Sequence, residues 1–213
     1  MTRVARHVHA GLIEYGAAWA LQQRLCERRQ RDEIGDVFLT CEHPHVITVG
    51  RRLRAQANIL SPRYPVFEVE RGGDVTYHGP GQLVGYPIIR LEDDERDLHR
   101  YLRDLETALI DVCQRCGVPA GRREGYTGVW TAEADADRRR KLASMGIAVR
   151  RWVTFHGFAL NVTTDLSAFS AINPCGFEPR IMTSLAAENA QFDDAPITLP
   201  AVVPLAAEAL GVA

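Results

Sequence analysis

Short apolar runs separated by turns, with few helical stretches between them, constrain the fold of this chain more than any other feature. The strand-like runs lie at residues 36–49, with a turn at Pro44, and at 65–70, 85–91, 127–130, 142–149 and 154–162. Helical periodicity appears at residues 14–31, 97–116 and 201–210, and Asp165 is placed to cap a short helix ending at Ala171. Because successive strands follow one another with few helices between them, the sequence predicts an α/β fold of the α+β type, with a mixed, largely antiparallel sheet flanked by helices.

The strongest helical pattern lies at residues 97–116. Apolar side chains recur there at three- and four-residue steps, and Gly117 and Pro119 then end the helix. The residues expected on its apolar face are Leu98, Tyr101, Leu102, Leu105, Leu109, Val112 and Cys116.

Length and charge define the class of protein. A chain of 213 residues predicts one domain, residues 1–213, and 46% apolar residues with a net charge of −2 are typical of a globular protein rather than a basic nucleic-acid binder. No apolar run is long enough to span a membrane, and residues 1–10 lack the apolar stretch of a secretory leader. Five cysteines without regular spacing favour the reducing cytoplasm over a disulfide scaffold.

A glycine-rich segment holds the most unusual backbone. Residues 72–85 contain five glycines and one proline, and the segment is expected to be a loop. Its composition fits either a loop whose amides line a ligand or an ordinary glycine-rich connection. Phosphate-loop, dinucleotide-binding, zinc-protease and serine-hydrolase motifs do not occur in the sequence.

Lys141 is the only lysine of the chain, and the other 24 of the 25 basic residues are arginine. Arginine keeps its proton near neutral pH, whereas lysine loses a proton readily when it is desolvated. The lone lysine is therefore a candidate for proton chemistry, and from composition alone chance under codon bias explains it equally well.

Cys175 differs from the other cysteines because it lies in a Pro-Cys-Gly turn outside any apolar pattern. Such a turn suits a displayed nucleophile and suits an inert turn cysteine about equally. Cys26, Cys41, Cys113 and Cys116 lie in apolar patterns and are expected to pack in the interior. The pair His43 and His45 predicts a polar turn rather than a metal site, and His156 is expected to be structural.

Several of these segments together resemble one family. They are Glu42-His43-Pro44 leading to Gly50-Arg51, RGGDVTYHGPGQL at residues 71–83, Gly128-Val129-Trp130, KLASMG at 141–146, HGFALNV at 156–162 and NPCG at 173–176. In this order they resemble the lipoyl(octanoyl) transferases, which pass an octanoyl group from acyl carrier protein to lipoyl domains. The resemblance covers residues 36–185 and implies a fold shared with lipoate-protein ligases and the catalytic domain of biotin protein ligases.

The resemblance also implies roles for individual residues. Cys175 would be the acyl-thioester nucleophile, and Lys141 would favour its thiolate form. The substrate pocket would comprise Arg71, Gly72, Gly73, Asp74, Val75, Thr76, Tyr77, His78, Ser144, Met145, Gly146, Gly157, Phe158 and Ala159. The expected partners are octanoyl-acyl carrier protein and the lipoyl domains of 2-oxoacid dehydrogenase E2 subunits and the glycine cleavage H protein. No nucleic acid, membrane, metal, cofactor or ATP is expected to take part, and the enzyme is expected to be a cytoplasmic monomer.

Three features depart from the family pattern or extend it. Residues 131–140 form a longer and more charged stretch than expected, and Leu142 stands where isoleucine is common. Between Arg122 and Arg151, eight basic residues face four acidic ones. This excess suits either the steering of an acidic carrier protein or a solvated charged loop.

Two functions of other classes compete with the transferase. An ATP-dependent lipoate ligase on the same fold would not need Cys175, and it would lack the His78-Gly79-Pro80-Gly81-Gln82 form of the loop. A non-catalytic lipoate-binding module would have no reason to pair a turn cysteine with the only lysine.

Overall fold

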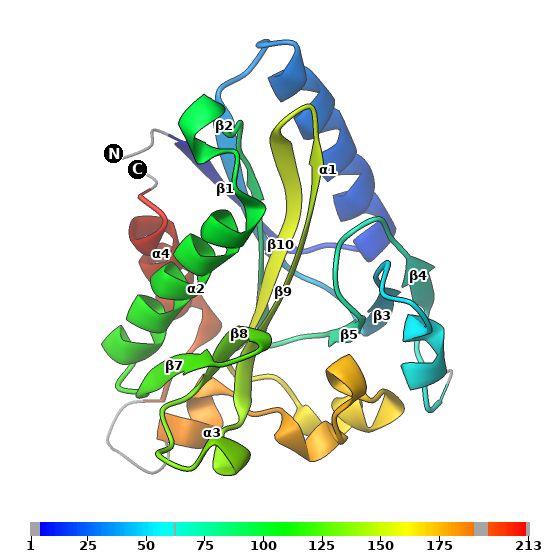
Figure 1. Cartoon of the computed structure of the whole chain (residues 1–213), viewed down its shortest axis with the longest axis vertical. Helices are drawn as coiled ribbons and strands as arrows, with labels where there is room; N and C mark the ends of the chain where they lie inside the picture. Colours follow the sequence, from blue (N-terminus) through cyan, green and yellow to red (C-terminus); the bar gives the residue numbers. More distant parts are fainter. Residues whose placement is uncertain (1–4, 62, 190–195, 212–213) are drawn as a thin grey trace.

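A mixed sheet forms the centre of the protein (Figure 1). The computed structural model describes residues 5–61, 63–189 and 196–211, and within them seven strands follow the order β1-β2-β6-β10-β9-β8-β7. The strands are β1 (Ala5–Leu12), β2 (Asp36–Glu42), β6 (Gln82–Ile88), β7 (Ala120–Arg123), β8 (Tyr126–Thr131), β9 (Lys141–Arg150) and β10 (Val153–Asn161). β1 runs parallel to β2, and the other neighbours are antiparallel. The predicted mixed, largely antiparallel sheet is confirmed.

Helices cover both faces of this sheet, as Figure 1 shows. On one face, α1 (Tyr15–Gln30) packs through Ala18 against a cluster that includes Val84. On the other face, α2 (Leu98–Arg115) and α4 (Leu199–Ala209) pack together over a core that includes Leu83. Because side chains alternate along a strand, adjacent residues of β6 reach opposite layers.

The helix predicted at residues 97–116 is present as α2. Asp97 caps it, since its carboxylate accepts hydrogen bonds from the amides of His99 at 2.9 Å and Arg100 at 3.1 Å. Its buried face differs slightly from the prediction: Leu98 is exposed and Cys113 is fully buried, while Cys116 packs at the edge of the core. The helix is therefore rotated so that residues nearer to Cys113 meet the sheet.

A second, smaller sheet lies beside the main one. It follows the order β4-β3-β5 in the described residues, with β3 (Val46–Val49), β4 (Val66–Glu68) and β5 (Val75–His78). The prediction of an uninterrupted loop at residues 72–85 is wrong, because β5 lies inside it and β6 begins at Gln82. The β-forming side chains of β5 pair antiparallel with β3, which confines the glycine-dependent backbone to the turns at Gly73 and Gly81, where φ is 86° and 78°.

Some other elements were not predicted, and others begin or end a few residues away from their predicted bounds. β1, β7 and the short α3 (Leu185–Asn189) were not expected from the sequence. Asp165 caps a 3₁₀ turn at Leu166–Ala171 by accepting from the amide of Ser167, as predicted. None of the helices in the described part of the chain combines the length and apolar character needed to cross a membrane.

Candidate active site

Lys141 and Cys175 lie side by side although 34 residues of chain separate them. Nζ of Lys141 is 3.7 Å from Sγ of Cys175. The lysine is only 3% exposed, at the start of β9, and the cysteine is half-buried. The pair therefore places a cation beside a potential nucleophile.

A tight turn presents Cys175. The residue lies in a one-turn 3₁₀ helix, Pro174–Gly176, with a left-handed backbone at φ 55° and ψ 26°. A non-glycine residue in that region costs about 1 kcal/mol or more, and such strain concentrates at functional sites. The amide of Asn173 donates to the carbonyl of Asn58 at 2.7 Å and so ties the turn to the 3₁₀ segment Ala55–Asn58.

Lys141 is held by its neighbours on both sides. Its ammonium lies 5.3 Å from the ring centroid of Trp130, which is fully buried on β8. The Lys141 carbonyl accepts from the amide of Thr183 at 3.0 Å, and Lys141 forms a parallel bridge with Met182. The segment that follows the Cys175 turn is therefore paired directly with the strand that begins at Lys141.

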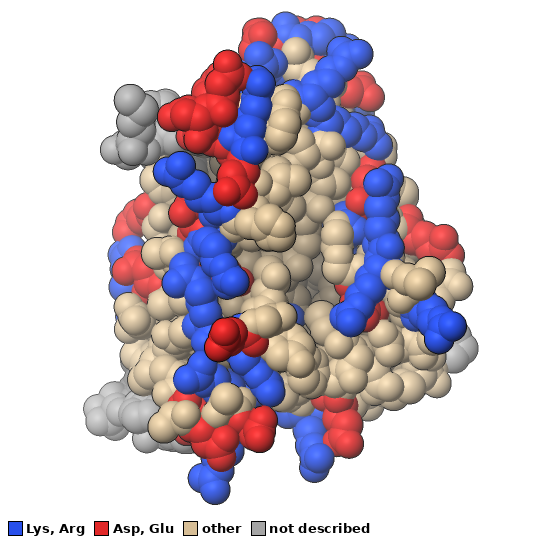
Figure 2. Space-filling view, in the orientation of Figure 1, with Lys and Arg blue, Asp and Glu red and all other residues tan. Residues whose placement is uncertain are grey.

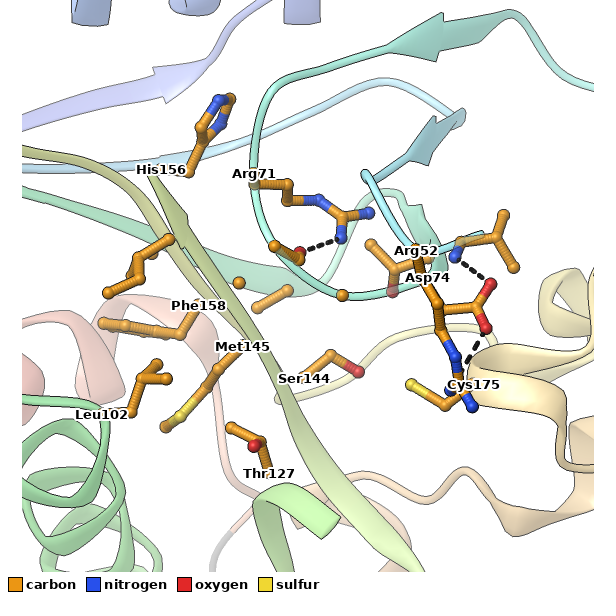
Figure 3. Close-up of a pocket in the computed structure, with 18 of the residues that line it drawn as sticks. Arg52, Arg71, Asp74, Leu102, Thr127, Ser144, Met145, His156, Phe158 and Cys175 are labelled. Atoms are coloured by element: carbon orange, nitrogen blue, oxygen red, sulfur yellow. Dashed lines mark hydrogen bonds and ion pairs between the residues drawn. The ribbon is translucent and has the colours of Figure 1, made fainter. Parts of the chain in front are cut away.

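Both residues line a cavity of about 300 Å³. Figure 3 shows Cys175 among the side chains that line it. Every pocket residue expected from the sequence also lines it, with the exception of Tyr77. Tyr77 instead belongs to the core of the smaller sheet, where its hydroxyl bonds to Nδ1 of His45 at 2.7 Å and its ring packs on Phe169.

The cavity has an apolar part away from the cysteine. In Figure 3, Leu102, Met145 and Phe158 lie together at the opposite side of the view from Cys175. Sequence reasoning placed Leu102 and Tyr15 in helical patterns but did not assign either to the pocket, and it did not single out Tyr126 of β8. No local pattern marks these residues as pocket residues, because the packing of α1 and α2 against the sheet brings Tyr15 and Leu102 to the cavity and the place of β8 in the sheet brings Tyr126.

Arg71 is a buried cation at the cavity wall. It is 7% exposed, and its guanidinium donates to the carbonyl and hydroxyl oxygens of Thr48, both at 2.9 Å, and to the carbonyl of Gly72 at 3.1 Å. Glycine is required opposite, since a Cβ on Gly146 would lie 2.6 Å from the carbonyl oxygen of Gly72. Asp74, next in the loop, accepts from Asn58 and lies 3.5 Å from Nη1 of Arg52.

Three histidines are buried at or near the cavity: His78 and His156 line it, and the ring centroid of His43 lies 5.7 Å from that of His78. Burial lowers the pKa of His43 and of His156 to about 4 and places that of His78 well below its ordinary value. They are therefore neutral at pH 7. His43 donates from Nδ1 to the carbonyl of Ile13 at 2.7 Å and meets the hydroxyl of Tyr86 at 2.7 Å, so it lies inside the protein rather than on a polar surface turn. The described residues contain no His, Cys, Asp and Glu cluster suited to a metal ion.

Arginines flank the hollow in the surface (Figure 2). Several of the basic residues between Arg122 and Arg151 have internal partners: Arg122 bonds to Glu106 at 3.0 Å, Arg140 to Glu188 at 2.9 Å and Arg150 to Glu70 at 2.8 Å. Arg138 keeps 80% of its side chain exposed. Several of these arginines thus pair with carboxylates of the protein itself, whereas Arg138 is mostly exposed to solvent.

Comparison with known proteins defines the family. Residues 14–210 match the model of the lipoyl protein ligase A/B catalytic domain. The chain is 51% identical to the octanoyltransferase of Geobacter metallireducens over 83% of this chain and 80% of that protein. It is 46% identical to the octanoyltransferase of Salinispora arenicola over 93% of this chain and 90% of that protein. The chain belongs to the octanoyltransferase family.

Solved structures of this family's fold agree with the architecture described above. A bipartite lipoate protein ligase of Thermoplasma acidophilum superposes with a TM-score of 0.70 at 16% identity, over 99% of this chain and 85% of that one. The biotin protein ligase of Leishmania major superposes with a TM-score of 0.53 at 8% identity, over 98% and 73%. The expected octanoyltransferase class and the expected likeness to both ligase folds are confirmed.

Proposed function

We propose that this octanoyltransferase moves the octanoyl group from octanoyl-acyl carrier protein to the ε-amine of a lysine on lipoyl domains, through a thioester on Cys175. The observation that carries the proposal is the 3.7 Å approach of the Lys141 ammonium to the Cys175 sulfur at the wall of the cavity. The proposed acceptors are the lipoyl domains of 2-oxoacid dehydrogenase E2 subunits and the glycine cleavage H protein. In this proposal residues 1–213 act as one catalytic domain and as a cytoplasmic monomer.

In the first step, the Cys175 thiolate attacks the carbonyl carbon of the donor thioester. A free thiol is only a few per cent ionised at pH 7, so the neighbouring Lys141 ammonium raises the population of the reactive form. The new carbon–sulfur bond forms as the bond to the phosphopantetheine sulfur breaks. The departing thiolate takes a proton from Lys141, which leaves the lysine neutral.

In the second step, the acceptor amine attacks the acyl-enzyme. The amine must lose a proton as the amide bond forms, and neutral Lys141 is positioned to accept it as Cys175 leaves as a thiolate. The dyad thereby returns to its starting state. Amide formation from a thioester is downhill, so the proposed reaction needs no ATP.

The cavity supports the choice of an acyl substrate. Its volume of about 300 Å³ and the apolar side chains of Leu102, Met145 and Phe158 suit a medium-length acyl chain attached at Cys175. Backbone amides are the natural donors for the oxyanion that forms in each step. The amides of Gly72 and Gly176 already bond to the carbonyls of Ile147 and Asn173, at 2.9 and 3.1 Å, so the proposed oxyanion donors are other amides of the site.

Intact-mass spectrometry after incubation with octanoyl-carrier protein, without ATP, tests the proposal. We expect one octanoyl adduct that hydroxylamine removes and that Cys175→Ala does not form. Cys116→Ala is the matched control, since Cys116 is also half-buried but lies at the end of α2, and this variant keeps the adduct. An adduct that requires ATP, or one that persists in Cys175→Ala, contradicts the proposal.

A further inference from the structure

A chain of buried hydrogen bonds begins at Arg71 in the cavity wall. Nη2 of Arg71 donates to Oγ1 of Thr48 at 2.9 Å, and that hydroxyl lies 3.3 Å from Nε2 of His78. The other ring nitrogen of His78, Nδ1, is 2.8 Å from Oε1 of Gln82. Since an amide oxygen only accepts, Nδ1 carries the hydrogen and Nε2 accepts from Thr48.

The chain continues from the cavity to the backbone of Lys141. Nε2 of Gln82 donates to Oδ1 of Asn161 at 3.0 Å, and Nδ2 of Asn161 donates to the carbonyl of Thr183 at 2.9 Å. The amide of Thr183 then donates to the carbonyl of Lys141 at 3.0 Å. Gln82, Asn161 and Thr183 are each 1% exposed or less, so water does not compete for these bonds.

From the Arg71 cation to the carbonyl of Thr183, every donor points the same way. Bonds arranged head to tail polarise one another, and each becomes stronger than it would be alone. The amide of Thr183 belongs to the preceding peptide group, so its bond to the Lys141 carbonyl is a separate link through the backbone of Thr183. The direction requires a neutral His78, and burial, with His43 and Arg71 nearby, keeps the pKa of His78 well below its ordinary value. The arrangement is therefore stable at neutral pH.

The side chain of Thr183 forms a second set of contacts, with Glu188 and through it with Arg140. Its hydroxyl donates to Oε1 of Glu188 in a short hydrogen bond, and the same carboxylate pairs with Nη2 of Arg140 at 2.9 Å. Glu188 is 5% exposed. Thr183 thus holds the carbonyl of Lys141 directly and, through Glu188, the residue before it.

We propose that Thr183 is a positioning residue that holds Lys141 within reach of Cys175. This inference rests on the proposed function, in which the lysine serves the cysteine. Thr183 lies eight residues after Cys175 on the segment that carries the nucleophile, so its bonds join the two halves of the dyad to each other. A displacement of about 1 Å at a reacting group can reduce turnover by about 100-fold, which gives such a residue a large effect without contact with substrate.

The test is the pH dependence with which iodoacetamide alkylates Cys175, followed by peptide mass spectrometry, together with kcat and KM for octanoyl transfer. Thr183→Val removes the hydroxyl bond to Glu188 at nearly constant volume. We expect alkylation at pH 7 to slow by about tenfold, as for a midpoint raised by about one pH unit. We also expect kcat to fall, with KM for the donor unchanged.

Thr154→Val is the matched control. Thr154 is equally buried on β10, and its hydroxyl donates to the carbonyl of Pro87 at 2.7 Å, away from the dyad. It should lose stability without a change in the alkylation midpoint. Thr183→Ser, which keeps the hydroxyl, should restore the midpoint, and Glu188→Gln should shift it if Thr183→Val does not fold. A midpoint that is unchanged in the folded Thr183→Val variant, or that moves equally in Thr154→Val, overturns the inference.

Lys141→Ala in the same assay separates this inference from the proposed function. Arg52 and Arg71 also line the cavity, so the assay must show that Lys141 contributes to the reactivity of the thiol. If Lys141→Ala leaves the midpoint unchanged, the dyad itself is refuted. If Lys141→Ala raises it and Thr183→Val does not, only the role of Thr183 is refuted.

Discussion

The main chain of Gly128 lies directly against the side chain of Lys141. A Cβ atom on Gly128 would come within 2.7 Å of Cε and 3.3 Å of Nζ of that lysine. The backbone of Gly128 has φ 129°, and its amide donates to the buried carboxylate of Glu106 at 2.9 Å. The absence of a side chain at Gly128 on β8 therefore leaves the space in which Lys141 approaches Cys175.

Gly128→Ala should displace Lys141 and reduce kcat by about tenfold or more, because a small misplacement of a catalytic group is costly. The variant should also lose stability, since the new Cβ would lie 2.5 Å from the carbonyl oxygen of Ala143. Activity and the thermal midpoint should both be measured. Gly121→Ala on β7, where nothing lies within 4 Å of the added atom, serves as the control and should keep its activity. Full activity in Gly128→Ala would show that Lys141 tolerates displacement.

Lys141→Arg separates charge from proton transfer. Arginine keeps a positive charge beside Cys175 but does not release its proton near neutral pH. We expect turnover to fall by about 100-fold or more, as general acid–base catalysis is lost. The alkylation rate of Cys175 should remain higher than in Lys141→Ala, because the charge still favours the thiolate. Steady-state kinetics and alkylation rates on the three proteins check this, and equal alkylation rates in the two variants would exclude the electrostatic contribution.

Charge reversal at Arg138 and Arg139 tests whether the arginine rim attracts an acidic carrier protein. The double change to glutamate should raise KM for octanoyl-carrier protein by about threefold or more at low salt, and the effect should vanish at high salt. Arg139 also donates to the carbonyls of Glu133 and Arg122, both at 2.8 Å, so the single Arg138→Glu variant should be measured beside it. Arg28→Glu, at the end of α1, is the control. A KM that stays the same at low salt removes the steering role.

The buried His43 predicts that acid weakens the fold. Burial lowers its pKa to about 4, below the ordinary value of 6.5 that it regains on unfolding. As the pH falls below 6.5, His43 binds a proton in the unfolded chain but not in the folded protein. The free energy of unfolding therefore keeps its full contribution from His43 above that pH and decreases down to about pH 4. His43 alone should cost about 2 kcal/mol of unfolding free energy between pH 7 and pH 5.

Urea unfolding at several pH values measures this loss. His43→Gln should be less stable at pH 7 but should show a shallower decline toward pH 5. His99→Gln, a change at an exposed histidine on α2, should leave the slope as it is in the parent protein. An equal slope in His43→Gln would mean that other groups cause the acid sensitivity.

Local patterns explain which elements were predictable. The α2 helix shows its apolar spacing, its Asp97 cap and its terminating glycine within one continuous stretch, so the sequence alone identifies it. The β1 strand lacks such a pattern, because it lies at the edge of the sheet and most of its side chains are not fully buried. Its pairing with β2 depends on residues about 30 positions away in the chain.

The candidate site also has a part that local motifs identify and a part that depends on tertiary packing. The motifs around Arg71, Lys141 and Cys175 identify the family and select most of the cavity lining, because each motif is contiguous in the sequence. Tyr77 was assigned to the pocket with its neighbours, yet strand alternation turns it toward the core of the smaller sheet. Leu102 was placed correctly on the apolar face of a helix, but only the docking of α2 showed that this face reaches the cavity.

The sequence by itself determined the α2 helix, several of the strands and the family, and it singled out Lys141 and Cys175 as candidates, because these patterns and motifs lie in short contiguous stretches of the chain. The tertiary structure decided the 3.7 Å between Lys141 and Cys175. That distance depends on Gly128 leaving space, on Thr183 binding the Lys141 carbonyl and on a strained backbone at Cys175. These contacts join segments far apart in the chain, and only the packing of the fold brings them together.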